Sequence, residues 1–412
     1  MKNNPLDDIV KCTVEVSSPA SNDATFDTIL LVVEAASAVG SKSINKTTAI
    51  SSADELLDYG YTVDDTAYSA AETAFSQNPA PDQLLVVVRQ KAEEDADDNE
   101  ASADVGGDTE SEDNPTSGEI PEGEESSGSG EDSEAGGDGD EIVAYENIKT
   151  TLARANNEAQ FYGIHLTSFR DPDDIQAAME WAEANEKIFG VEYMKYGECP
   201  IKNFTYFRTF CMFSGNADGF DGDDQPKTNE YAALAWMAKC FGYDPGTETW
   251  ALKPLATIVP SSLGTAEKNE LEAKKINRFL RYAGDNITIG GYMVSGEWID
   301  VIRFRDWLKN EMQVNVFNVL KVNRKVPFTD AGIGLVEGAM KYTLEKGVEV
   351  GGIATTQYDA DDNEIPGFTV TVPRSANLTD AERKSRKLTG CKYTARLAGA
   401  IHAVEIYGYL TF

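Results

Sequence analysis

Few side chains in this 412-residue sequence are spaced to do chemistry. The only two histidines, His165 and His402, each fall in a stretch that we expect to form a β-strand. A Ser-His-Asp or Cys-His centre needs an imidazole beside its nucleophile, and a histidine-based metal site needs several rings together. We therefore expect both rings to be structural, and the sequence argues against either kind of centre.

The common nucleotide and hydrolase motifs are absent. Neither GxxxxGK[ST] nor GxGxxG occurs, so no glycine-rich loop is available to hold a phosphate. Met293 and Val294 precede Ser295, which excludes a GxSxG nucleophile turn there. One acidic loop has acids at relative positions one, four and six, whereas an EF-hand needs them at one, three, five and twelve. Its acids are Asp218, Asp221, Asp223 and Asp224. We expect no catalytic residue, no cofactor and no metal.

A basic cluster without any acidic residue lies between positions 383 and 396. It consists of Arg383, Lys384, Arg386, Lys387, Lys392 and Arg396. In a chain with a formal net charge of −34, such a cluster is either a solvated helix face or a surface that attracts an acidic partner. Residue types alone leave both alternatives open. The overall charge disfavours nucleic acid and anionic membrane as main partners, because both would repel the chain.

The elements that position these residues alternate between strands and helices as far as Pro260. We expect strands at 28–37, 82–90, 159–167, 187–194, 204–214 and 250–260. We expect helices at 52–60, 64–77, 145–157, 171–186 and 228–242. Continuous apolar runs such as 82–90 are typical of parallel strands covered on both faces. This order predicts an α/β fold with a mainly parallel sheet.

Beyond Pro260 the pattern predicts an α+β part. A hairpin is expected at 286–298, turning at Gly290 and Gly291. The other expected elements are helices at 265–283, 298–322 and 327–348, a strand at 367–373, a short helix at 378–388 and a strand pair at 390–412. Thr329 or Asp330 is expected to cap the second long helix.

Both ends of the chain have the period-two pattern of a strand with one buried face. The apolar faces are formed by Val10, Cys12, Val14 and Val16 near the start and by Val404, Ile406 and Leu410 near the end. An unpaired edge strand is an aggregation hazard in a monomer but a means of joining subunits in an assembly. We predict that these residues pair with strands of other subunits.

Residues 93–141 form a low-complexity insertion. It holds 21 acidic residues and no basic ones, which leaves a formal charge of −13 on the rest of the chain. Its few apolar side chains cannot offset the entropy of ordering, so we expect a solvated surface loop.

Composition also indicates where the chain is made. No apolar run approaches the roughly 20 residues that span a bilayer, and the start lacks the apolar core of a signal peptide. The five cysteines include no CxxC pair, so we expect reduced thiols and assembly in the cytoplasm.

Three C-terminal phrases carry a family resemblance. They are SGEWIDVIRFRDWLKNEMQ from Ser295, VPFTDAGIGLVEGAMKYTLEKGV from Val326 and VTVPRSANLTDAERKSRKLTGCKYTARLAGAIHAVEIYGYLTF from Val370. These phrases resemble the tail sheath proteins of contractile-tailed bacteriophages, and AYSAAETAFSQNPAPDQLLVV from Ala67 resembles the N-terminal domain of the same branch. The likeness covers most of residues 5–90 and 145–412 and does not include the acidic insertion.

The resemblance implies a structural subunit, and no enzyme, that polymerises helically around a tail tube and contracts to drive the tube through the host envelope. The implied parts are an N-terminal arm strand at 1–24, an outer α/β domain at 25–262, an inner tube-facing α+β domain at 263–403 and a C-terminal arm strand at 404–412. The implied partners are other copies of the chain, the tail tube protein and the baseplate and tail terminator proteins, within the virion tail. Within the inner domain we expect Arg383, Lys384, Arg386 and Lys387 to face the tube.

Two alternatives remain at this point. An acidic α/β enzyme of the cytoplasm would need a cleft with converging polar groups and would bind a small ligand. A sheath from a headless injection particle would share every feature above, and a neighbouring capsid gene would separate it from a phage sheath.

Overall fold

The computed structural model describes residues 25–92, 144–215 and 227–411. The chain divides into two units, of which the first contains residues 1–90 and 146–412 and the second residues 91–145. In the second unit Lys91 forms an antiparallel bridge with Tyr145. The predicted acidic insertion at 93–141 lies entirely outside the described residues. The helices and strands below all belong to the first unit.

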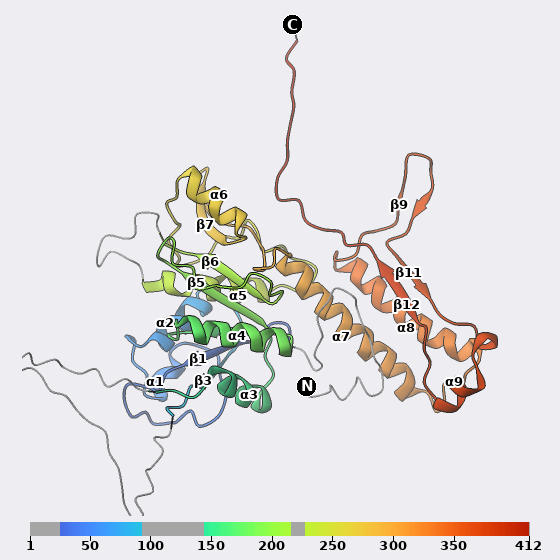
Figure 1. Cartoon of the computed structure of the whole chain (residues 1–412), viewed down its shortest axis with the longest axis horizontal. Helices are drawn as coiled ribbons and strands as arrows, with labels where there is room; N and C mark the ends of the chain where they lie inside the picture. Colours follow the sequence, from blue (N-terminus) through green and yellow to red (C-terminus); the bar gives the residue numbers. More distant parts are fainter. Residues whose placement is uncertain (1–24, 93–143, 216–226, 412) are drawn as a thin grey trace, which may run out of the picture. The chain divides into compact units, whose positions relative to one another are not determined.

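A large sheet forms the α/β part (Figure 1). It has eight strands in the order β2-β3-β1-β4-β5-β6-β7-β8. Its strands are β1 Ile29–Val33, β2 Thr48–Ile50, β3 Leu84–Val88, β4 Gly163–Leu166, β5 Ile188–Tyr193, β6 Thr209–Phe213, β7 Asn277–Tyr282 and β8 Asp285–Ile289. Neighbours from β3 to β7 are parallel, and the two edge strands β2 and β8 are antiparallel to theirs. Strand β1 is buried along its whole length, as its continuous apolar run predicts. The predicted α/β fold with a mainly parallel sheet is confirmed.

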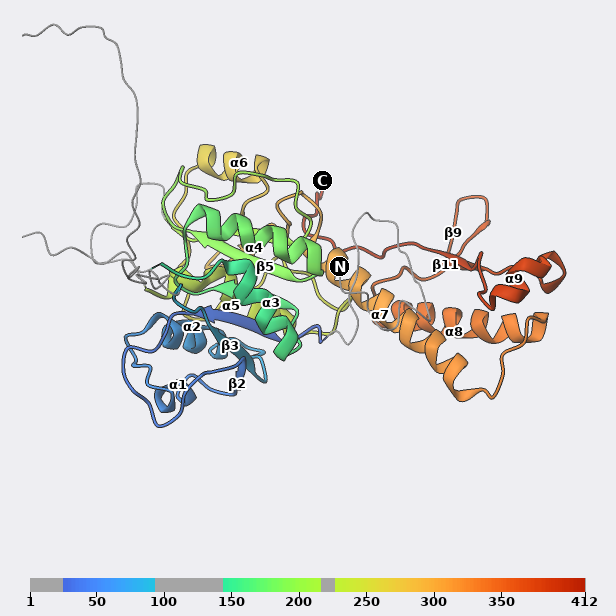
Figure 2. The ribbon, with the colours of Figure 1, turned by 60° about the horizontal axis from the view of Figure 1, so that its bottom comes forward.

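Helices cover both faces of this sheet (Figure 2). They are α1 Glu55–Asp58, α2 Thr66–Phe75, α3 Ile148–Glu158, α4 Pro172–Asn185, α5 Ala232–Phe241 and α6 Thr265–Ala273, with a short 3-10 helix at Lys227–Tyr231. Helices α2 and α5 pack together on one face, and α3 and α4 pack together on the other. Helix α4 begins where sequence chemistry favours it, because the Asp171 side chain accepts from the Asp173 N–H at 2.8 Å and Pro172 follows as the first helical residue.

Two predictions near residue 260 are wrong. Residues 250–260 do not form a strand, because Leu252 and Thr257 have φ angles of 61° and 64°, which interrupt an extended chain. The helix predicted at 265–283 ends at Ala273, since Lys275 has a φ of 57° and the chain then enters the sheet as β7.

The predicted hairpin is also misplaced. Strands β7 and β8 turn at Ala283 and Gly284, whose φ angles of 49° and 104° suit a two-residue hairpin turn. Gly290 and Gly291 follow the end of β8 instead. The sheet therefore continues beyond residue 262, where we expect a domain boundary, and that boundary stays a prediction.

The C-terminal part is built on two long helices, α7 Ile299–Val322 and α8 Asp330–Glu349, which pack against each other. The remaining elements are β9 Gln357–Tyr358, β10 Glu364–Ile365, β11 Phe368–Thr371, a 3-10 helix at Ser375–Asn377, α9 Asp380–Ser385 and β12 Lys392–Ala395. Thr329 caps α8, because its hydroxyl accepts from the Gly332 N–H at 3.3 Å. The strand pair predicted within 390–412 is wrong, since β12 pairs with β11 and the described residues after Ala395 form no strand.

Helix α7 is shared by two hydrophobic cores. Ile299 and Ile302, at its start, lie in the core that contains α2, α5 and the sheet. Phe304, Leu308 and Met312 lie in a second core with α8 and the β11–β12 pair. The helix therefore joins the two parts of the first unit through buried side chains at both ends of its first half.

Buried charges hold the start of α7 against the α/β part. Arg303 is 1% exposed and donates to a Glu248 carboxylate oxygen at 2.5 Å, as well as to the backbone carbonyls of Phe26, Cys240, Phe241 and Tyr243. All the carbonyls that accept from Arg303 belong to the α/β part. These acceptors compensate for the burial of the Arg303 guanidinium, and the bonds to them fix the position of the helix.

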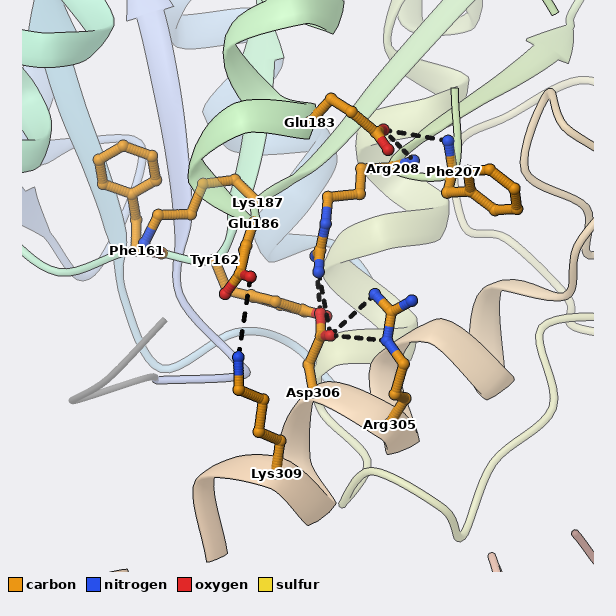
Figure 3. Close-up of polar contacts among 10 residues, drawn as sticks. All are labelled: Phe161, Tyr162, Glu183, Glu186, Lys187, Phe207, Arg208, Arg305, Asp306 and Lys309. Atoms are coloured by element: carbon orange, nitrogen blue, oxygen red, sulfur yellow. Dashed lines mark hydrogen bonds and ion pairs between the residues drawn. The ribbon is translucent and has the colours of Figure 1, made fainter. Parts of the chain in front are cut away.

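Asp306 forms the second anchor (Figure 3). Its carboxylate accepts from both terminal nitrogens of Arg208 at 2.7 and 3.0 Å, from the Tyr162 hydroxyl at 2.7 Å and from Arg305. Burial alone would raise the pKa of Asp306, but the Arg208 and Arg305 guanidinium groups hold it below its usual value. The charged form is therefore the one that the fold stabilises.

We expect Asp306→Asn to lower the free energy of unfolding by about 3–5 kcal/mol, because it leaves the buried Arg208 guanidinium without its counter-charge. Urea unfolding at neutral pH measures this loss. Since the native state depresses the pKa of Asp306, its contribution is present above the ordinary aspartate pKa and is lost as the pH falls. The gap between wild type and variant should therefore narrow in acid.

The matched control is Asp58→Asn, which removes the exposed partner of Lys42. It should change stability little, because exposed ion pairs are screened by water. Equal losses in both variants would contradict the anchoring role of Asp306.

Candidate assembly surfaces

The small β11–β12 sheet offers open strand edges. Its register pairs Phe368 with Ala395 and Thr371 with Lys392, and no described strand pairs with its outer edges. One face is closed, because Phe368, Val370 and Tyr393 pack on the core shared by α7 and α8. The backbone groups along the outer edges are therefore the part of this sheet that another strand can reach.

The chain beyond this sheet is bonded to the rest of the fold as far as His402, and the residues after it are exposed. Arg396 N–H donates to the Gly367 carbonyl at 2.8 Å, and Ala398 N–H donates to the Gly352 carbonyl at 3.1 Å. His402 then lies 2.7 Å from the Thr249 hydroxyl and against the Trp298 ring, which ties this point to the α/β part.

From Ala403 onward the described chain has no strand and extends to the end marked C (Figure 1). The exposed fractions of Val404, Ile406 and Leu410 are 72%, 87% and 103%, so three apolar side chains are largely exposed to solvent. The N-terminal residues that are also predicted to pair with another subunit lie outside the described residues. They are Val10, Cys12, Val14 and Val16. Pairing of either group with another subunit stays a prediction.

The residues of the basic cluster differ in exposure. Arg383 is partly buried and donates to the Phe328 carbonyl at 3.0 Å and to the Ser375 carbonyl, which ties α9 to the start of α8. Lys384, Arg386 and Lys387 are exposed at the end of α9 and beyond it. Only these three of the four predicted tube-facing residues are available to a partner without loss of an internal contact.

The two histidines lie in structural surroundings. His165 is fully buried with its Nε2 3.2 Å from both Glu192 oxygens, and Glu192 also accepts from Arg170 and from the Ala233 N–H. Burial would raise the pKa of Glu192, but Arg170 and His165 hold it at about 2. This group of charges joins β4, β5 and the start of α5, and both His165 and Glu192 are buried within it.

A second buried charge cluster was missed by the sequence analysis (Figure 3). Glu186 and Lys187 form the turn between α4 and β5, and Lys309 on α7 lies opposite, with its Nζ 4.0 Å from Glu186 Oε1. The signal was present, because Arg305, Asp306 and Lys309 follow Ile302 at the three- and four-residue spacing of one helix face. Charged residues at positions on the apolar face of a helix indicate that they are buried and paired. The sequence does not show which residues they pair with.

The described residues contain no group of three or more His, Cys, Asp and Glu side chains that could hold a metal ion. The acidic loop Asp218, Asp221, Asp223 and Asp224 lies outside them. Among the helices that the structure describes, none combines the length and the apolar composition that a membrane crossing requires.

Residues 299–409 match the family model described as "E217 tail sheath protein gp31-like, C-terminal domain". These residues begin with α7 and include α8, the β11–β12 sheet and most of the exposed terminal segment. No curated protein matches the chain significantly.

Solved structures share the fold over nearly the whole chain. A chain of the anti-feeding prophage baseplate has 14% identity and a TM-score of 0.58, covering 97% of this chain and 98% of that one. The contracted anti-feeding prophage helical sheath has 11% identity and a TM-score of 0.58, covering 95% and 94%. The contracted PVC sheath complex, from an extracellular contractile injection system, has 10% identity and a TM-score of 0.59, covering 97% and 96%.

At these identities the structural likenesses concern the fold, and the family match concerns residues 299–409. Residues 299–409 therefore carry a C-terminal domain of the tail sheath protein type, and the whole chain shares its fold with solved contractile sheath structures.

Proposed function

We propose that this chain is the sheath subunit of a contractile phage tail, which polymerises around an inner tube and shortens to drive the tube through the host envelope. The observation that carries the proposal is the tail sheath C-terminal domain at residues 299–409. The fold shared with two contracted sheaths supports it. The partners are other copies of the chain, the tube protein and the baseplate and tail terminator proteins, in the virion tail.

Strand addition is the proposed bond between subunits. The open edges of the β11–β12 sheet supply unpaired backbone groups, and the segment from Val404 to Leu410 supplies an extended chain with an apolar face. Each strand added to an edge gains main-chain hydrogen bonds, and its apolar side chains leave water. The N-terminal strand with Val10, Cys12, Val14 and Val16 is proposed to pair in the same way.

Contraction needs no nucleotide in this proposal. A rigid-body rearrangement between two packings of the same subunits releases the free energy by which the contracted packing is more stable. Flexible strand links between neighbours allow the subunit bodies to move while the array stays connected. Lys384, Arg386 and Lys387 are proposed to meet the tube through complementary charge.

Negative-stain microscopy of the purified chain tests the function. A sheath subunit should form long hollow cylinders, whereas an acidic α/β enzyme should give uniform small particles. Microscopy of the native particles then separates a phage tail, which is attached to a capsid, from a headless injection particle.

We expect a chain truncated after Ala403 to fold but to fail in forming cylinders. The truncation removes Val404, Ile406 and Leu410 and leaves the contacts of His402 intact. The described residues 404–411 contact little of their own chain, so the unfolding transition should change little. Sedimentation measures assembly, and thermal unfolding measures the fold.

A matched control changes the other side of the same segment, by Glu405→Gln together with Thr411→Ser, and should still assemble. Normal cylinders from the truncated chain would contradict strand addition by the C-terminal segment.

We expect the triple variant Lys384→Glu, Arg386→Glu and Lys387→Glu to assemble poorly on tubes at low salt. The reversed charges repel an acidic tube surface, and added salt should reduce the difference because it screens exposed charges. Arg383 is left unchanged because it ties α9 to α8. Co-sedimentation with tubes measures the yield.

The control carries three equal charge reversals on exposed lysines of the α/β part, Lys46→Glu, Lys195→Glu and Lys202→Glu. If both triple variants give the same yield, α9 does not meet the tube.

A further inference from the structure

The turn between α4 and β5 meets α7 through buried charges (Figure 3). Glu186 is 4% exposed and Lys309 is 9% exposed, and the Lys309 Nζ lies 4.0 Å from Glu186 Oε1. No hydrogen-bond partner reaches either carboxylate oxygen of Glu186 within the described part of the chain. If Glu186 is ionised, its carboxylate is stabilised only by attraction to nearby cations such as Lys309. It lacks the hydrogen bonds that usually compensate for burial.

The backbone adds two further costs. Glu186 has a φ of 59°, a left-handed conformation that glycine usually adopts at the end of a helix. It also follows the carboxyl end of α4, where the last carbonyl groups disfavour a negative charge. A strained position that carries a buried acid is therefore a place to look for function.

Charged groups from every neighbouring element face Glu186. They are Lys187 in the turn, Arg208 before β6, and Arg305, Asp306 and Lys309 on α7. Burial raises the pKa of Glu186 to about 7, against the attraction of Arg208 and Lys309. Burial likewise lowers the pKa of Lys187 to about 8, and its ammonium donates to the Phe161 carbonyl at 2.6 Å.

We propose that Glu186 is a proton-dependent clamp between the α4–β5 turn and helix α7. With a proton bound, the neutral carboxyl packs beside α7 and the junction is closed. Without it, the buried carboxylate favours opening of the junction toward water. The clamp regulates how firmly α7, which carries the tail sheath C-terminal domain, is docked on the α/β part. It does not depend on the proposed function.

The direction of the pH effect follows from linkage. A carboxyl in water loses its proton near 4.5, whereas Glu186 in the closed junction keeps its proton to about 7. The closed state therefore binds more protons in that interval. Its advantage is greatest below the ordinary glutamate pKa and is lost as the pH rises through the native value.

Hydrogen exchange of the full chain, followed by mass spectrometry, tests the clamp. Peptides covering residues 182–190 and 299–316 are compared at roughly pH 5.5 and roughly pH 7.5, after correction for intrinsic exchange. In wild type the opening equilibrium should rise on the order of tenfold across this interval. In Glu186→Gln, which cannot ionise, the rise in residues 182–190 should vanish. Lys187 stays mostly charged in this interval, so it contributes little.

Asp300→Asn is the matched control. Asp300 is also on α7, and burial raises its pKa to about 6, so it titrates in the same interval. If Glu186 is the clamp, this variant keeps the pH response of residues 182–190. A response that survives in Glu186→Gln and disappears in Asp300→Asn would overturn the proposal.

Lys309→Met tests the link to α7 separately. Loss of the ammonium removes an attraction that favours the charged carboxylate, so the midpoint of the pH response should move to higher pH. An unchanged midpoint would show that Lys309 on α7 does not affect the protonation of Glu186, and this result would contradict the proposed clamp. The test remains valid even if Glu186→Gln fails to fold.

Discussion

Helix α7 packs in two hydrophobic cores, so its side chains must fit two different sets of neighbours. Its start lies in the core of the α/β part, and the side chains from Phe304 onward enter the core that it shares with α8. Arg303 and Asp306 lie at the crossing and are buried, so each needs a fixed partner. Glu248, several backbone carbonyls and Arg208 supply those partners. Such pairs add less to stability than their number suggests, but they specify the rotation and the position of the helix along its axis.

Backbone hydrogen bonding separates the two parts of the fold. In the eight-stranded sheet every strand between the edges has neighbours on both sides. The β11–β12 sheet has two strands and is closed on one face only. A two-stranded sheet is marginal alone, and packing on α7 and α8 supports this one. No described strand pairs with the outer edges of this small sheet, so both edges differ from the paired strands of the large sheet.

The described charges fall into two groups with different physical roles. Buried charges such as Glu192, Arg303 and Asp306 are paired inside the fold and set its geometry. Exposed charges such as Lys384, Arg386 and Lys387 act at long range and respond to salt. Glu186 belongs to neither group, since it is buried but lacks hydrogen bonds. That intermediate state makes its protonation sensitive to a pH change that leaves Glu192 and Asp306 charged.

Local patterns in the sequence determined the strands of the parallel sheet as far as β6, the two long helices, the Thr329 cap and the family resemblance, because apolar period and capping depend on near neighbours. They did not determine the β7–β8 hairpin. The residues that shape this region, Leu252, Thr257, Lys275 and Ala283, adopt left-handed conformations without being glycine.

Nor did they determine which charges meet. Asp306 and Arg208 are 98 residues apart, and Glu186 lies beside Lys309 only because the turn after α4 packs on α7. Only the tertiary structure decides such pairs, since their energy depends on burial and distance and not on sequence spacing.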